Sequence, residues 1–190
     1  MATQAERRAT TRGKLIDAAA SVFAERGYHG ATLDAIAERA GLSKGSVYHH
    51  FASKHVLFAT LLGDRLEARL AEAPRPEDAA AAFLDRASDP RWAPLFFEFL
   101  AQAARDDDVR EVFVAWLRDT RARLADLIAE RLGGPPDEQR AVLVSALANG
   151  MLIEVMFDPS VPPELLGRGV ELLASATGAG GGGSVPRRGA

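Results

Sequence analysis

The chain has 190 residues, of which 47% are hydrophobic and 26% charged, with a net charge of −3 and no cysteine. This composition excludes disorder over most of the length, and it predicts either one sizeable core or a small head with a larger body. The lack of cysteine excludes disulfides, thiolate nucleophiles and zinc-thiolate sites, and it fits a reducing cytoplasm.

The charge is unevenly divided along the chain. Residues 1–55 hold 8 Lys and Arg against 5 Asp and Glu, a balance of +3, whereas the remainder holds 15 against 21, a balance of −6. A basic head on an acidic body predicts that nucleic acid is contacted through a small, defined surface. We expect no apolar run long enough to cross a bilayer and no signal peptide, and therefore a cytoplasmic protein without membrane contact.

The N-terminal segment combines a basic start with an apolar repeat. Residues 1–9 are polar and basic, which predicts a flexible arm that either reaches phosphates or serves only as a soluble tail. A first helix is predicted to end at Gly27, and Tyr28 is expected to pack into the core of the head. The buried stripe of this helix comprises Leu15, Ala18, Ala19, Val22 and Phe23.

Two short helices joined by a tight turn are predicted next. Thr32 can cap the first of them, and Gly41 ends it, because glycine adopts the left-handed backbone that often follows a helix. Ser43 can cap the second helix, over residues 44–51, whose apolar anchors are Val47 and Phe51. The pattern is typical of a helix-turn-helix, although a hairpin of an ordinary helical bundle would also produce it.

The polar side chains of this stretch favour the first alternative. Residues 43–51, SKGSVYHHF, followed by Ser53, Lys54 and Leu57, resemble the recognition helix and the next helix start of the TetR family of transcriptional regulators. Two departures are Ala52, where a turn residue is frequent, and His55, where an acidic residue is usual. The resemblance is looser beyond the head, and upstream it includes Leu15, Ile16, Ala18, Ala19, Phe23, Gly27, Tyr28, Thr32, Ile36, Ala37, Ala40 and Gly41.

The resemblance implies a role for each matching polar residue. The helix over 44–51 would enter the major groove, with Gly45 and Ser46 close to base edges. It also implies a homodimer in which the last two helices of each protomer form a four-helix bundle. The side chains implied to hold phosphates are Thr32, Lys44, Tyr48, His49 and Lys54.

The predicted fold class is all-α, since no strand pattern occurs. Ser53 caps a connecting helix that ends before Pro74, and it joins a three-helix DNA-binding domain (1–55) to a helical ligand-binding and dimerisation domain (56–177). Residues 178–190 are rich in glycine and are expected to be disordered. Helices are predicted in the body over residues 77–87, 91–105, 108–132, 137–157 and 163–177.

Two features of the body bear on function. Its aromatic stripes belong either to ordinary core packing or to the wall of a cavity for an apolar or aromatic ligand. Residues 142–155 are apolar nearly all round, which predicts that a second copy of the chain covers them. The ligand-binding candidates are Trp92, Phe96, Phe99, Phe113, Trp116, Thr120, Asn149 and Glu154, and the dimer-interface candidates are Leu147, Met151, Val155, Leu165, Leu166 and Val170.

No catalytic site, metal site or cofactor is predicted. The histidines all lie in the head, but adjacent His49 and His50 point about 100° apart on a helix and form no ligand pair. The leading hypothesis is a homodimeric repressor that a small apolar or aromatic effector releases from operator DNA. The alternatives are an activator of the same fold, or a helical small-molecule-binding or interaction protein without specific DNA binding.

Overall fold

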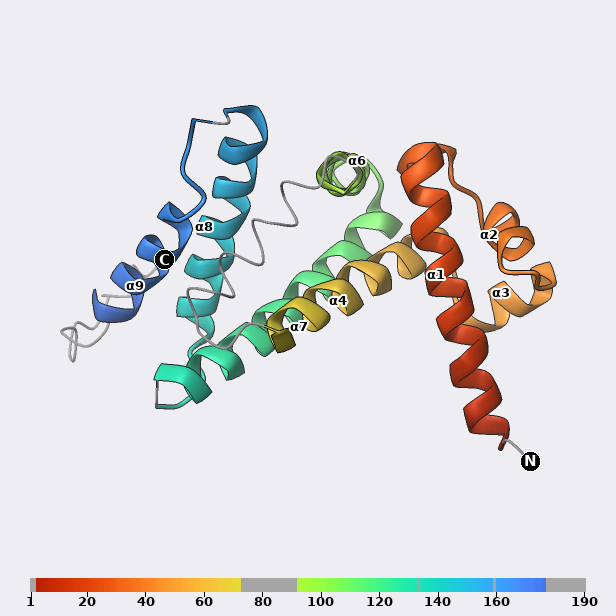
Figure 1. Ribbon diagram of the computed structural model, residues 1–190, viewed down its shortest axis with the longest axis horizontal. Coiled ribbons are helices and arrows are strands. Elements are labelled where there is room, and N and C mark those ends of the chain that lie inside the picture. Colours follow the sequence, from red (N-terminus) through yellow and green to blue (C-terminus); the bar gives the residue numbers. More distant parts are fainter. Residues whose placement is uncertain (1–2, 73–91, 133, 159, 177–190) are drawn as a thin grey trace, which may run out of the picture. The chain divides into compact units, whose positions relative to one another are not determined.

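The computed structural model describes residues 3–72, 92–132, 134–158 and 160–176. Within these residues every regular element is a helix, which confirms the predicted all-α class (Figure 1). The helix predicted over 77–87 and the tail over 178–190 lie outside the described residues. The helices are α1 (Gln4–Gly30), α2 (Leu33–Arg39), α3 (Lys44–His50), α4 (Lys54–Glu72), α6 (Ala93–Ala103), α7 (Asp107–Leu132), α8 (Glu138–Phe157) and α9 (Leu165–Ala176).

The described helices fall into two compact units. The first unit, here the head unit, contains α1 to α4, α6 and the part of α7 up to Thr120. The second unit contains the remainder of α7 together with α8 and α9. This division differs from the boundary predicted after residue 55, because side chains of α4, α6 and α7 share one hydrophobic cluster with α1 to α3.

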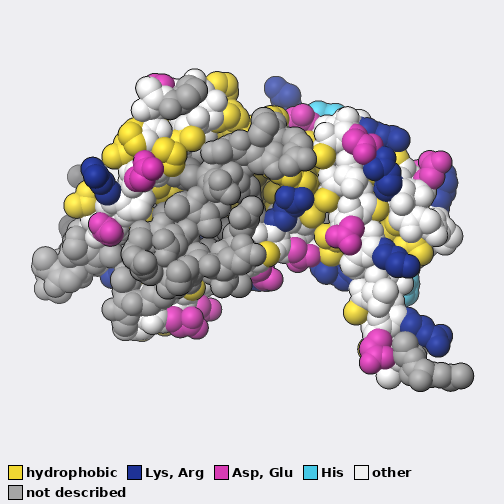
Figure 2. All heavy atoms as spheres, in the orientation of Figure 1, with side chains coloured by type: hydrophobic (Ala, Val, Ile, Leu, Met, Phe, Trp, Pro, Cys, Tyr) yellow, Lys and Arg dark blue, Asp and Glu magenta, His cyan; other side chains and the backbone are white. Residues whose placement is uncertain are grey.

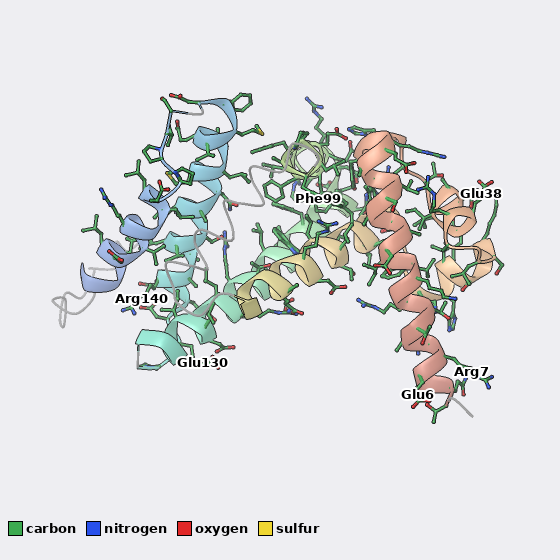
Figure 3. The ribbon with its side chains drawn as sticks, in the orientation of Figure 1. Glu6, Arg7, Glu38, Phe99, Glu130 and Arg140 are labelled. Carbon is green, nitrogen blue, oxygen red and sulfur yellow. The ribbon has the colours of Figure 1, made fainter. Side chains whose placement is uncertain are left out.

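The start of α1 differs from the sequence prediction. The Thr3 hydroxyl accepts a hydrogen bond from the Glu6 N–H at 3.2 Å, and the Glu6 carboxylate accepts one from the Thr3 N–H at 2.6 Å. This reciprocal capping box satisfies backbone donors that a helix start otherwise leaves free. Residues 4–9 are therefore helical and not a flexible arm, and Figure 3 shows Glu6 and Arg7 on the first turns of α1.

The regular part of α1 ends at Gly27, as predicted. Gly27 has φ 71° and ψ 172°, a conformation that is nearly restricted to glycine. The Tyr28 N–H that follows the kink donates to the Glu98 carboxylate of α6 at 2.8 Å. A side chain far along the chain thus satisfies the backbone at the kink.

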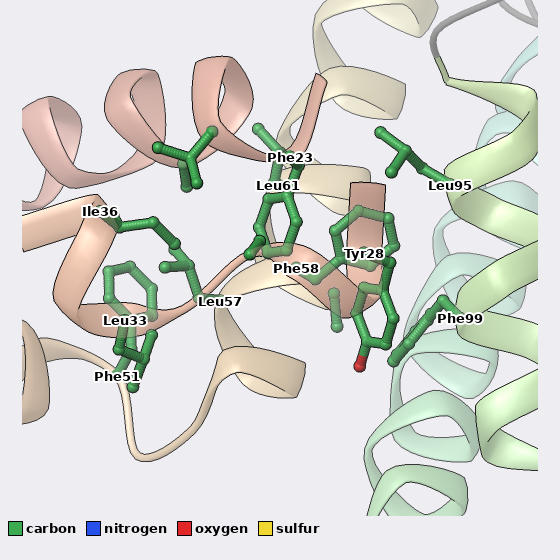
Figure 4. Packing of buried hydrophobic residues seen from close by; sticks show 14 of the residues in the cluster. Phe23, Tyr28, Leu33, Ile36, Phe51, Leu57, Phe58, Leu61, Leu95 and Phe99 are labelled. Atoms are coloured by element: carbon green, nitrogen blue, oxygen red, sulfur yellow. The ribbon is translucent and has the colours of Figure 1, made fainter. Parts of the chain in front are cut away.

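Four buried aromatic rings form the centre of the head unit: Phe23 and Tyr28 from α1, Phe58 from α4 and Phe99 from α6. The Phe58 ring centroid lies 4.8 Å from that of Phe23, 5.0 Å from that of Tyr28 and 5.1 Å from that of Phe99. All three contacts are edge-to-face, the geometry that the ring quadrupoles favour. Figure 4 shows these rings beside the apolar side chains of α2 and α4, so α6 shares the core of the head.

The connecting helix α4 begins at the predicted cap, because the Ser53 hydroxyl accepts from the Val56 N–H at 3.2 Å. Its first turns are held in the head unit, where Leu57, Leu61 and Leu62 are buried. At the next residue, a Cβ placed on Gly63 would lie 3.8 Å from the indole nitrogen of Trp116. As far as Gly63, α4 is therefore part of the packed core of the head unit.

The second unit packs α8 against α9. Leu166 of α9 is 1% exposed, so its side chain is already covered within the protomer. A Cβ on Gly169 would lie 2.6 Å from Cδ2 of Leu147, so the glycine allows α9 to approach α8 closely.

Large apolar side chains nevertheless remain exposed on this unit. By length and composition, α8 is apolar enough to span a membrane, so the prediction that no such run exists is wrong. A helix that lies in a protein interface passes the same test, because its covered face is apolar as well. The exposed side chains are Val142, Leu143, Ile153, Phe157, Leu165 and Leu172.

Candidate DNA-binding surface

The turn between α2 and α3 is fixed by backbone hydrogen bonds. The Thr32 hydroxyl caps α2 by accepting from the Ala35 N–H at 3.2 Å. At the other end, the Leu42 N–H donates to the Ala37 carbonyl at 2.9 Å and the Gly41 N–H to the Glu38 carbonyl at 3.1 Å. These two bonds make a Schellman motif, and Gly41 has the left-handed φ of 66° that the motif requires. The predicted turn is confirmed.

The short helix α3 is anchored on one face and open on the other. The Ser43 hydroxyl caps it by accepting from the Ser46 N–H at 3.3 Å. Val47 is 0% exposed and Phe51, at the C-cap, is 3% exposed, so these two side chains fix the helix on the core of the head unit. The outward residues are Lys44, Gly45, Tyr48 and His49, which are exposed, and Ser46, which is half-buried.

Glycine at position 45 leaves the start of α3 open. A Cβ built on Gly45 would meet only the Ser43 hydroxyl, at 4.0 Å. Tyr48, one turn after Gly45, is 57% exposed, which is unusual for a large aromatic side chain. Together they form a surface that a second molecule can approach closely at one end and pack against at the other.

Lys44 is paired before any DNA is bound. Its ammonium donates to the Asp34 carboxylate of α2 at 2.5 Å, and that hydrogen bond, together with the opposite charge, raises the pKa of Lys44. Both side chains are substantially exposed, so the pair is worth little in water. A phosphate can therefore replace Asp34 as the partner of Lys44 at low cost.

Lys54, for which the resemblance implies a phosphate contact, is also held within the protein. Its ammonium donates to the Tyr28 carbonyl at 2.8 Å and lies 4.7 Å from the centre of the Tyr28 ring. Burial lowers the pKa of Lys54, while the charge of Glu98 opposes that shift. The structure thus gives Lys54 a role in closing the end of α1, which sequence spacing alone does not reveal.

Thr32 combines capping with exposure. Its hydroxyl oxygen accepts the hydrogen bond from the Ala35 N–H that caps α2. Because the residue is exposed, the hydroxyl can still donate its own proton to a molecule outside the protein. Because Thr32 and Lys44 line the same shallow depression beside the turn, the two predicted phosphate contacts lie on one side of the head.

A polar contact beneath this surface was not predicted. The Tyr28 hydroxyl is hydrogen-bonded to Nδ1 of His55, at the start of α4. Burial raises the pKa of Tyr28, and burial also lowers that of His55, with the nearby charge of Lys54 adding to the second effect. Within the described residues, no group of three or more acidic or histidine side chains is arranged to hold a metal ion.

The aromatic candidates for ligand binding are divided by burial. Trp92, Phe99 and Phe113 are 5%, 0% and 8% exposed and belong to the core cluster. Phe96 and Trp116 are half-buried, with ring centroids 6.1 Å apart, and Thr120 is half-buried on α7. Asn149, half-buried, and Glu154, exposed, belong to α8 in the other unit.

Trp116 carries a polar atom without a partner. Its indole nitrogen is buried and makes no hydrogen bond within the part of the chain that the structure describes. Such a donor costs free energy unless a partner is supplied. No sequence pattern marks this atom, because its burial depends on α4 lying against α7.

The dimer candidates are also divided by burial. Leu165 is exposed, whereas Leu166 is covered within its own protomer and offers little area to a partner. The remaining candidates are half-buried: Leu147, Met151, Val155 and Val170. Of the large apolar residues on α8 and α9, Phe157 and Leu172 are the most exposed; Leu172 lies in the last helix that the sequence assigns to the dimer surface, whereas Phe157 was not predicted.

Known proteins resemble this chain over different lengths. The transcriptional activator FasR of Mycolicibacterium smegmatis is 53% identical over 51 residues, which are 27% of this chain and 23% of that protein. The transcriptional regulator CymR of Pseudomonas putida is 39% identical over 119 residues, 57% of this chain and 59% of the relative. The chain thus spans less than two thirds of the length of these two relatives.

A solved structure is similar over most of the chain. It is a transcriptional regulator from Rhodococcus sp. Rha1, 30% identical with a TM-score of 0.57, and the match covers 87% of this chain and 94% of that one.

Two family descriptions match the sequence. Residues 15–61 match bacterial regulatory proteins of the tetR family, and residues 77–176 match the C-terminal domain of BetI-type transcriptional repressors. The chain therefore belongs to the TetR family of bacterial transcriptional regulators, which are DNA-binding proteins and not enzymes.

Proposed function

We propose that this chain is a cytoplasmic, homodimeric repressor that binds operator DNA and leaves it when a small apolar or aromatic effector binds. The observation that carries the proposal is the geometry of α3, which is fixed on its inner side by Val47 and Phe51 while its outer face stays open. A short helix held in this way can enter the major groove without rearranging.

The proposed contacts divide into two kinds. Gly45 and Ser46 lie near base edges, since one has no side chain and the other has a short donor and acceptor. Lys44, Tyr48, His49 and Thr32 contact phosphates, which fix the position of the protein but read no sequence. Lys54, whose ammonium is held by the Tyr28 carbonyl, acts indirectly by holding α4 against the kink of α1.

The first test measures binding to the DNA upstream of the chain's own gene. Lys44→Ala should weaken binding roughly tenfold and lower the slope of log Kd against log salt by about one unit, because one phosphate contact is lost. Ser46→Ala should instead change which sequences are preferred. Arg105→Ala, an exposed charge on the loop before α7, is the control and should change neither.

Experiments with the same protein and DNA separate two alternative functions. A helical ligand-binding protein without specific DNA binding would show no preference for any sequence in a selection from a random pool. An activator would bind the operator equally well and raise transcription from it. Repression is favoured because residues 77–176 match a repressor type, whereas the similarity to an activator is confined to 51 residues.

The proposed dimer uses the apolar residues that α8 and α9 leave exposed. An isologous contact through them would cover a surface that is costly to leave in water. It would also place two α3 helices about one turn of DNA apart, on a near-palindromic site. A monodisperse monomer at micromolar concentration would contradict this part of the proposal.

The proposed effector site lies in the head unit, at the half-buried rings of Phe96 and Trp116 and the neighbouring Thr120. These rings offer an apolar surface, and the unpartnered Trp116 indole N–H can donate to an acceptor on the ligand. Phe96 lies on the same helix as Glu98, whose carboxylate holds the kink of α1. A shift of α6 would therefore reach the DNA-binding surface.

Control of this kind requires a ligand that prefers one of two conformations. The coupling is reciprocal, so operator DNA must weaken effector binding by the factor by which the effector weakens operator binding. Titrating a library of hydrophobic compounds against tryptophan fluorescence, with and without operator, tests this. Equal affinity in the two states for every compound that binds would show that the site is not the switch.

A further inference from the structure

Arg8 and Arg12 lie on the same side of α1 as its buried residues, but nearer the N-terminus than the first of these. Arg8 precedes the buried Leu15 by close to two helical turns, and Arg12 stands in the same relation to the buried Ala19. Because α1 is helical from Gln4, both arginines lie on the side of α1 that faces the rest of the head. A flexible arm would not fix them there.

Arg12 extends from this position to the end of α3. Its guanidinium carbon lies 5.7 Å from the centre of the Phe51 ring, at the C-cap of α3, and its Nη1 lies 3.6 Å from the Asp64 carboxylate of α4. The Arg12 and Asp64 side chains are 45% and 43% exposed, so water screens the ion pair. The guanidinium thus stays available to a stronger anion.

Arg8 lies one turn nearer the N-terminus and is exposed. Within the described residues it has no ion-pair partner, and the acid nearest to it in sequence, Glu6, is engaged with the Thr3 N–H. His50, the last residue of α3, has its pKa lowered by burial and then by the positive charges of His49, Arg8 and Arg12. The lowered pKa leaves the His50 ring neutral at pH 7, so the positive charge at this end of α3 comes from Arg8 and Arg12 of α1.

We propose that Arg8 and Arg12, here called the basic ledge, bind phosphates of the duplex whose major groove receives α3. The inference rests on the proposed function, since it extends the same surface along the DNA backbone. The partner follows from charge and continuity: the ledge adjoins the C-terminal end of the reading helix, and a polyanion is the ligand that such a cluster favours. Figure 2 shows Lys and Arg side chains along α1 on the face in view.

The test uses Arg8, because its side chain is exposed, and a random-sequence duplex as the probe. Arg8→Ala should weaken binding roughly tenfold and lower the slope of log Kd against log salt by about one unit. Arg8→Lys should restore the slope. Lys14→Ala is the matched control, because Lys14 is an exposed cation on the same helix, about 200° round the axis from Arg12.

The possible results separate the ledge from the proposed function. If Arg8→Ala and Lys14→Ala change the slope equally, or not at all, while Lys44→Ala lowers it, the ledge is refuted and the role of α3 stands. If Lys44→Ala is also without effect and no sequence is preferred, the proposed function fails, and the ledge fails with it. Thermal melting of each variant checks that the fold is retained.

Ethylation interference on the upstream DNA gives an independent reading. With the unmodified protein, ethylating phosphates that flank those contacted by α3 should block binding. With Arg8→Ala only these flanking positions should lose their effect, since Lys44 still holds its own phosphate. Identical interference patterns for the two proteins would overturn the proposal.

Discussion

The two compact units differ in how far their large apolar side chains are buried. In the head unit the large aromatics Phe23, Phe58 and Phe99 are each 0% exposed, and each touches another ring. In the second unit Phe157 is 75% exposed and Leu172 is 69% exposed. The head unit buries its large aromatic rings against one another, whereas the second unit leaves apolar side chains exposed that a partner can cover.

The largest expected effect, on the free energy of unfolding, comes from removing a buried ring from the core of the head unit. Phe99→Ala should cost about 3–5 kcal/mol of unfolding free energy, because it removes the ring that touches Tyr28, Phe58 and Phe113. Urea denaturation measures the cost. Leu100→Ala, at the next position and 38% exposed, is the control, and an equal loss there would contradict the contrast.

A charge on the exposed face of the second unit should act on assembly more than on folding. Leu143 is 52% exposed, so Leu143→Glu leaves the protomer folded but places an unpaired carboxylate in the proposed dimer contact. The dimer dissociation constant should rise at least about 100-fold, with operator binding lost in parallel. Light scattering measures the mass, and Gln139→Glu, near the start of the same helix, should remain dimeric.

A smaller effect is expected at the kink of α1. Gly27→Ala forces a Cβ into a backbone conformation with φ 71° and should cost about 1–3 kcal/mol. Gly13→Ala on the same helix meets nothing within 4 Å and should be neutral or stabilising by up to about 1 kcal/mol. Thermal unfolding of the two variants compares them, and equal shifts would argue that the kink carries no strain.

The smallest effect concerns pH. The pKa of His55 is lowered in the folded protein, mainly by burial, so its contribution to stability is full above the unfolded-state pKa near 6.5. That contribution is lost as the pH falls through the folded-state pKa. Between pH 7 and pH 5 the Tm of the unmodified protein should fall about 2–4 °C more than that of His55→Asn, which stays neutral. Parallel curves would contradict this role.

Local chemistry explains what could be predicted. The caps at Thr32, Ser43 and Ser53 and the turn at Gly41 each depend on residues within a few positions of one another, and each was predicted. The Thr3 and Glu6 capping box is equally local, but the basic composition of residues 1–9 predicts an arm instead of a helix start. A capping signal can therefore outweigh a run of charge.

The contacts that could not be predicted join residues far apart in sequence. Glu98 accepts from the Tyr28 N–H across 70 positions, and nothing in either segment marks the pairing. Lys54 matched a family position and still donates to the backbone carbonyl of Tyr28. The position of an exposed charge can be predicted from sequence, but its partner depends on how helices pack.

The placement of Phe99 in the core of the head has a consequence for recombining this protein with its relatives. A chimera joined between α3 and α4 would bring a foreign α4 and α6 against Phe23 and Tyr28, so its core would be mismatched from the start. A junction near Thr120, where the two compact units divide α7, would carry the aromatic cluster across intact. The suitable junction for exchanging the two units with a relative therefore lies inside a continuous helix and not in a loop.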